Sequence, residues 1–208
     1  MEIKAYPNGI YGATTYLVAD KASKEAILID CTSSVDEIEK EIKNNNLNLK
    51  YILITHGHFD HCYCLSKMKE KFPLAQILIH KDDMSLIERM DLQCQMADIP
   101  AFSLPCVDGL VDENTKNLKL GEYDIKVIHT KGHSKGGVCY LINNVLFSGD
   151  TLFKDSIGRY DLFGGNYAEI ISSIKDKLFT LNDDIKVYPG HGESTTIGYE
   201  KKYNPYFQ

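Results

Sequence analysis

The sequence predicts an α/β (α+β) protein in which two mixed β-sheets pack face to face with helices outside, an αββα sandwich. Predicted strands, followed by mixed strands and helices, occur twice along the 208 residues. A hydrophobic content of 43% and a charged content of 25% are typical of a globular chain with a substantial core. No interdomain linker separates the halves, so we expect a single domain over residues 1–208.

The first half opens with strands that alternate with polar turns. Two antiparallel strands are predicted at 14–19 and 25–30, joined by a polar turn. Ser34-Val-Asp-Glu37 is a capping box, which predicts a helix that continues to about residue 44. The elements that follow are a strand at 51–54, a helix at 60–71, a strand at 77–79 and a short helix at 82–90.

The second half starts with an irregular stretch. Residues 91–118 contain Pro100, Pro105 and Gly109, and a long loop in a compact domain is usually functional, so we expect it to form one rim of an active site. The predicted elements after it are strands at 123–129, 137–142, 145–148 and 185–188, and helices at 167–179 and 195–202.

The run Thr55-His-Gly-His-Phe-Asp-His61 follows the predicted strand 51–54. Because a strand alternates its side chains, His56, His58 and Asp60 should project together if the extended geometry persists, while His61 points elsewhere. Two sets of ligands in two directions suit a pair of metals. A polar loop that holds its histidines by chance is the alternative, but three of the chain's seven histidines fall within these six positions.

Three further segments each place one candidate ligand after an apolar strand and a glycine. They present His133, Asp150 and His191. Glycine lets the backbone turn sharply and approach a site closely, so these loops could complete a metal site.

In this order, HxHxDH followed by His, Asp and His, the chain resembles the metallo-β-lactamase superfamily over nearly its full length. Within it, the chain is most similar to the short single-domain bacterial hydroxyacylglutathione hydrolases (glyoxalase II). The more specific matches are SGDTLF at 148–153, SIGRYDL at 156–162 and YPGHGESTTIG at 188–198. Lys135, Gly137 and Tyr160 depart from the family pattern without removing a ligand.

The resemblance implies two divalent metal ions and assigns a role to each candidate ligand. His56, His58 and His133 would hold the first metal. Asp60, His61 and His191 would hold the second, and Asp150 would bridge both. Two such ions, two carboxylates and a bridging hydroxide leave a net charge of about +1, which suits attack by the hydroxide on a polarised carbonyl. Imidazole and carboxylate ligands favour zinc, with iron or manganese as alternatives.

Other residues are expected to act around the metals. The resemblance implies that Asp30 supports the HxHxDH loop from behind, and His129 is expected to orient a ligand through a hydrogen bond. His80 is interpreted as structural. Arg159 would either pair with Asp161 to hold its loop or clamp a substrate carboxylate through its planar fork.

The resemblance implies hydrolysis of a small-molecule thioester, with a 2-hydroxyacyl thiol such as S-lactoylglutathione as the model substrate. The C-terminal helical domain that binds glutathione in larger relatives is not expected, which leaves the thiol carrier open. One alternative is an oxidoreductase similar to the mononuclear-iron persulfide dioxygenases, which share a GRxD stretch like that at 158–161. A lactonase or β-lactamase is another.

Bulk properties restrict the partners further. A net charge of −6 argues against nucleic acid, whose binding depends on cationic neutralisation of phosphates. The N-terminus has no apolar region of a signal peptide and no run reaches membrane-spanning length, so we expect a cytoplasmic protein that does not bind membranes. The six cysteines form no CxxC pair, and Cys62 and Cys64 beside the ligand run are interpreted mainly as buried small residues. The oligomeric state stays open.

Overall fold

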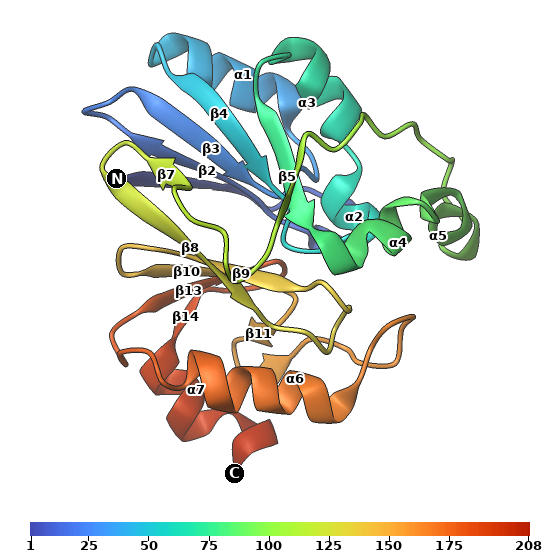
Figure 1. Ribbon diagram of the computed structural model, residues 1–208, viewed down its shortest axis with the longest axis vertical. Coiled ribbons are helices and arrows are strands. Elements are labelled where there is room, and N and C mark those ends of the chain that lie inside the picture. Colours follow the sequence, from blue (N-terminus) through green and yellow to red (C-terminus); the bar gives the residue numbers. More distant parts are fainter.

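Two six-stranded mixed sheets lie face to face in the computed structural model, which describes residues 1–208 (Figure 1). In the first sheet, β1 to β3 are antiparallel and β3 to β6 are parallel. Its strands are β1 (Glu2–Tyr6), β2 (Thr15–Asp20), β3 (Glu25–Ile29), β4 (Asn48–Leu53), β5 (Gln76–His80) and β6 (Gly109–Val111).

In the second sheet, only the pair β10 and β13 is parallel. Its strands, in spatial order, are β14 (Thr195–Thr196), β13 (Lys186–Pro189), β10 (Val145–Gly149), β9 (Val138–Ile142), β8 (Tyr123–His129) and β7 (Lys119–Leu120). A separate two-stranded ribbon joins β11 (Leu152–Phe153) and β12 (Ser156–Ile157).

Helices cover the outer face of each sheet (Figure 1). The first sheet is covered by α1 (Val35–Asn44) and α3 (Leu65–Lys71). The second is covered by α6 (Tyr167–Ser173), which continues as a π-helical turn (Ile174–Leu178), and by α7 (Ile197–Tyr203). Short helices at one edge are α2 (Phe59–Cys62), α4 (Met84–Ile87) and α5 (Met90–Met96). The 3₁₀ turns are η1 (Ile10–Gly12), η2 (Lys81–Asp83) and, near the C-terminus, η4 (Pro205–Phe207). None of the helices combines the length and the apolar character that crossing a membrane requires.

Three apolar layers follow from the alternation of side chains along the strands. On β3, Ile27 and Ile29 face the second sheet, whereas Ala26 and Leu28 face the outer helices, where they join Ile38 of α1. The middle layer also contains fully buried aromatic side chains of the second sheet, and a third layer lies beneath α6. The αββα sandwich predicted from the sequence is therefore confirmed.

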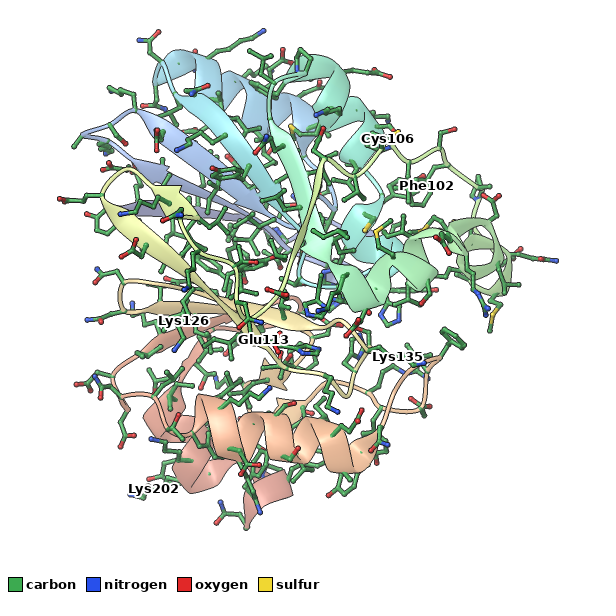
Figure 2. The ribbon with its side chains drawn as sticks, in the orientation of Figure 1. Phe102, Cys106, Glu113, Lys126, Lys135 and Lys202 are labelled. Atoms are coloured by element: carbon green, nitrogen blue, oxygen red, sulfur yellow. The ribbon has the colours of Figure 1, made fainter.

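The local elements differ from the prediction in several places, two of which lie near the loops of the first sheet. The helix expected at 60–71 is divided into α2 and α3, because the Cys64 N–H donates to the Cys31 carbonyl (2.9 Å) instead of continuing the helical ladder. The irregular stretch 91–118 contains most of α5 and the parallel strand β6. Phe102 and Cys106, labelled in Figure 2, lie on the long segment that connects these two elements, and Phe102 packs against the outer core of the first sheet.

Candidate metal centre

Four loops that each follow a strand meet at one edge of the sandwich. The loop after β4 contains the HxHxDH run, and the loops after β8, β10 and β13 contribute one side chain each. All seven candidate ligands predicted from the sequence are brought together there. They fall into overlapping groups whose ligand atoms lie within 4.8 Å of one another: His56, His58 and His133; His56, His61 and Asp150; and Asp60, His61 and His191.

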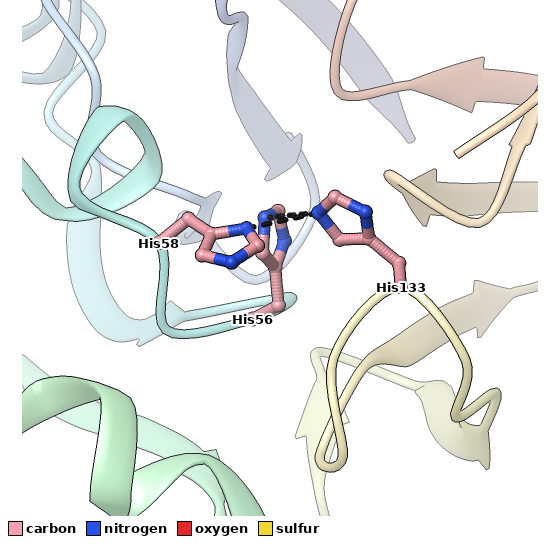
Figure 3. Close-up of side chains that lie close together, drawn as sticks. All are labelled: His56, His58 and His133. Atoms are coloured by element: carbon pink, nitrogen blue, oxygen red, sulfur yellow. Dashed lines mark hydrogen bonds between the residues drawn. The ribbon is translucent and has the colours of Figure 1, made fainter. Parts of the chain in front are cut away.

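The first group consists of three buried imidazoles whose nitrogens face one another (Figure 3). His133 Nε2 lies 2.9 Å from His58 Nδ1 and 3.2 Å from His56 Nε2. The three ring planes are nearly perpendicular in pairs, at 82° to 88°. Because a nitrogen lone pair lies in its ring plane, three edge-to-face rings direct their lone pairs toward one common point, as three ligands of one ion do.

The second group joins Asp60 and His61 to His191. His191 Nε2 lies 3.3 Å from His61 Nε2 and 3.4 Å from Asp60 Oδ2. The expectation that Asp60 projects together with His56 and His58 is wrong, because the extended backbone ends at His58 and α2 begins at Phe59. The helical turn directs Asp60 to the same side as His61 and thereby creates a second ligand set.

Asp150 lies between the two groups. Its Oδ2 is 3.6 Å from His133 Nε2 and 3.5 Å from His191 Nε2, and its Oδ1 is 3.4 Å from His61 Nε2. Oδ1 is buried and has no hydrogen-bond partner. A buried carboxylate oxygen without a partner is rare in proteins, and a cation at this point would satisfy it. The donor set therefore fits a divalent metal.

Hydrogen bonds on the outward side fix the tautomers of four of these histidines. In each, Nδ1 faces an oxygen acceptor, so Nδ1 bears a proton and Nε2 is the nitrogen that faces the centre. The acceptors are Thr55 Oγ1 for His56 (3.0 Å), Asp30 Oδ2 for His61 (2.7 Å), the Arg159 carbonyl for His133 (2.7 Å) and the Tyr11 carbonyl for His191 (3.1 Å). Thr55 can accept because its own hydroxyl proton is donated to Asp30 (2.8 Å).

The electrostatics divide the histidines into two kinds. Burial lowers the pKa of His58 to about 3 and that of His133 to about 4, so both rings are neutral and ready to bind a cation. Burial also acts to lower the pKa of His61, but the carboxylates of Asp30, Asp150 and Asp60 outweigh it and raise the pKa to about 10. The second group thus attracts positive charge, which a proton or a metal ion can supply.

Asp30 supports the HxHxDH loop through both carboxylate oxygens. Oδ1 accepts from the Thr55 N–H (2.7 Å), and Oδ2 accepts from the Thr55 hydroxyl and from His61 Nδ1. Asp30 adopts a left-handed backbone conformation (φ 58°), which an aspartate tolerates better than most residues. The structure thus places this carboxylate behind the loop, where the sequence analysis expected it.

Asp83 is a functional candidate that the sequence analysis missed. Its fully buried carboxylate accepts from the Gly57 N–H (2.9 Å), the Ser134 hydroxyl (2.7 Å) and the Gly136 N–H (2.6 Å). It therefore connects the loop of His56 and His58 to the loop of His133. The one signal in the sequence was its position just after a predicted strand that leads to the same edge.

The Arg159 side chain pairs with Asp161, which is one of the two roles expected of it from the sequence. Its Nε and Nη2 donate to the two carboxylate oxygens of Asp161, each at 2.9 Å, and both side chains are more than half exposed. Its backbone carbonyl, rather than its side chain, orients His133. Arg159 nevertheless lines the cavity above the centre.

His129 forms no hydrogen bond with any of the seven candidate ligands. Its Nε2 donates to the Lys135 carbonyl (2.8 Å), which holds the loop that contains His133 and that Figure 2 marks at Lys135. Its ring stacks on His80 at 4.1 Å with planes only 25° apart. Glu113 Oε2 lies 3.9 Å from His129 Nδ1 and 4.0 Å from His80 Nε2. Nearly parallel rings do not direct their lone pairs to one point, so this His–His stack differs from the metal-type group of His56, His58 and His133.

Cys62 and Cys64, next to the ligand run, are both buried. Cys62 belongs to α2, and burial raises the pKa of its thiol well above the usual range. The Cys64 thiol donates to the Thr32 carbonyl at 3.4 Å. Neither thiol belongs to a group of ligand atoms at the centre.

The fold and the paired His and Asp clusters define the class: a metallo-hydrolase type of αββα protein. The family model of the metallo-beta-lactamase superfamily matches residues 9–191, and the chain belongs to that superfamily. The chain is similar to hydroxyacylglutathione hydrolase GloC of Haemophilus influenzae, with 34% identity covering 99% of this chain and 98% of that protein.

Two solved structures show the same architecture. BLEG-1 B3 metallo-beta-lactamase superimposes with a TM-score of 0.90 and 32% identity over 100% of both chains. The di-iron-bound form of TTHA1623 superimposes with a TM-score of 0.85 and 30% identity, over 97% of this chain and 99% of that one.

Proposed function

We propose that this protein is a hydrolase that uses two divalent metal ions. His56, His58 and His133 would hold the first, and Asp60, His61 and His191 the second, with Asp150 shared between them. Nitrogen and oxygen donors without thiolate suit zinc, and iron or manganese are alternatives. The proposal is supported by the three overlapping groups of ligand atoms and by the di-iron form of a structural relative.

Bound there, the ions would polarise a carbonyl group and lower the pKa of a water molecule toward about 7. The chain's own residues prepare the site for this. Asp30 and the backbone carbonyls of Tyr11 and Arg159 hold imidazole rings in the tautomer that offers Nε2.

The substrate we propose is a thioester, specifically a 2-hydroxyacyl thioester. Water would add its oxygen to the acyl carbon, the carbon–sulfur bond would break, and the products would be a carboxylic acid and a free thiol. The observation on which this depends is the Asp150-linked double cluster, which lies beneath a cavity of about 630 Å³. The similarity to a hydroxyacylglutathione hydrolase supports the choice of thioesters.

The test is a hydrolysis panel on protein whose metal content is measured by elemental analysis. We expect two ions per chain and turnover of S-lactoyl thioesters, with no turnover after chelation and recovery after zinc is restored. A protein with two ions that hydrolyses none of the thioesters would refute the substrate class. A single ion per chain would refute the two-metal mechanism.

A second candidate is β-lactam hydrolysis, which the close superposition on a B3 metallo-beta-lactamase favours. It would use the same ions on an amide instead of a thioester. Adding a chromogenic cephalosporin to the panel compares the two directly. Oxygen uptake with a glutathione persulfide tests the remaining alternative, a mononuclear-iron dioxygenase, against which the complete second ligand group argues.

A further inference from the structure

The cavity above the metal centre has an apolar wall. Ten of its fifteen lining residues lie outside the His and Asp cluster, and eight of these ten are hydrophobic. Phe59 belongs to α2 and Leu86 to α4, and Phe153, Leu162 and Phe163 come from the segments that follow Asp150. A ligand that reaches the centre must therefore lie against apolar surface.

The two polar residues of this wall already have partners. Gln93 donates through Nε2 to the carbonyls of Gly57 (3.0 Å) and Leu86 (2.9 Å), and its Oε1 accepts from the Phe59 N–H (3.2 Å). Arg159 is neutralised by the paired hydrogen bonds with Asp161. Outside the metal ligands, the wall therefore offers no charge without an opposite charge beside it.

Three large apolar side chains surround the mouth of the cavity and are open to water. Tyr11 is 69% exposed, Met96 80% and Phe163 53%, although they come from three separate segments. The Arg89 guanidinium lies 4.8 Å from the Phe163 ring centroid and connects α5 to the facing loop. Apolar surface gathered around one opening gains free energy when a ligand covers it.

We propose that the thiol part of the substrate lies against this wall, so that the enzyme selects thioesters of apolar, uncharged thiols over those of glutathione. The proposal rests on the proposed thioester hydrolysis. A 2-hydroxyacyl group is small and its oxygens suit the metal centre, which leaves the thiol part to fill the cavity. Glutathione would bring two carboxylates and an ammonium group to a wall whose one charged residue outside the metal ligands, Arg159, is already paired with Asp161, while Arg89 at the rim lies over the Phe163 ring.

The first experiment measures kcat/KM for S-lactoyl thioesters of ethanethiol, butanethiol and hexanethiol, whose thiols have nearly the same acidity, and for S-lactoylglutathione. We expect kcat/KM to rise about two- to fourfold for each added methylene, and the hexyl ester to exceed the glutathione ester. A flat series, or a preference for glutathione, would overturn the inference while the thioesterase function stands. Absence of turnover with every ester would instead refute the proposed function.

The second experiment assigns the preference to the wall. Met96→Gln and Phe163→Ser should flatten the chain-length dependence, lowering kcat/KM for the hexyl ester more than for the ethyl ester. Leu74→Ser is the matched control, because Leu74 is 90% exposed but lines no part of the cavity. A change in chain-length dependence equal to that of the control would overturn the assignment.

Binding provides a readout that does not depend on turnover. The thioether analogues, in which a methylene replaces the carbonyl, cannot be hydrolysed, and calorimetry gives their Kd for wild type and for both variants. We expect tighter binding with chain length and a negative heat-capacity change for wild type, the signature of apolar burial. Equal Kd values for the ethyl and hexyl analogues would contradict an apolar thiol site.

Discussion

Replacement of Asp83 by alanine should destabilise the protein and weaken metal binding together. The change leaves three buried donors without an acceptor, on Gly57, Ser134 and Gly136. Each unsatisfied buried donor costs about 1–3 kcal/mol, so we expect a loss of about 3–9 kcal/mol for the three donors. That is a large part of the about 5–15 kcal/mol that stabilises a typical domain. Metal affinity should fall about 10- to 100-fold, because the two ligand loops lose their connection.

Asp83→Asn is the graded variant, since its amide oxygen can still accept while its NH₂ group faces a donor. We expect it to cost about 1–3 kcal/mol. Asp82→Ala is the matched control, because that neighbouring carboxylate is 47% exposed and its removal should change stability by less than about 0.5 kcal/mol. Denaturant unfolding followed by circular dichroism, with metal affinity from competition with a chelator dye, measures both quantities. The reasoning is refuted if Asp83→Ala and Asp82→Ala are equally stable.

Three further outcomes are expected. Asp150→Ala should abolish thioester hydrolysis and lower the metal content of both groups, measured by elemental analysis, whereas His80→Ala should keep activity within about threefold. The melting temperature of metal-free protein should fall as the pH drops from about 6.5 to about 4. Over this range the unfolded chain gains protons that His58 and His133, with pKa values lowered by burial to about 3 and about 4, do not take up. Arg159→Lys should raise KM little, because Asp161 already neutralises the guanidinium.

The αββα sandwich could be predicted because alternating apolar residues decide which face of each strand is buried. Short edge strands such as β7 and β14 were not predictable, since two residues give no periodicity and are held by the neighbouring strand. The break between α2 and α3 could not be predicted from the sequence either. It depends on the bond from Cys64 to the Cys31 carbonyl, a contact between residues 33 positions apart.

The candidate ligands could be read from the sequence because imidazole and carboxylate side chains are chemically specific and cluster around glycine turns. Some of the groups that orient these ligands are backbone carbonyls instead of side chains. His133 and His191 donate to the backbone carbonyls of Arg159 and Tyr11, and any residue type supplies a carbonyl. These carbonyls reach the rings only when the chain is folded. The identities of the residues in the sequence therefore do not predict which carbonyls orient the ligands.

Because a backbone carbonyl acts independently of the side chain, the backbone and the side chain of one residue can have separate roles at the centre. The Arg159 carbonyl fixes the tautomer of His133, while its guanidinium is neutralised by Asp161 at the border of the cavity. Orientation of the ligands therefore does not depend on which side chain stands at the border. On our proposal, the geometry of the ligand set can then remain constant while residues such as Met96 and Phe163 select the thiol that the cavity accepts.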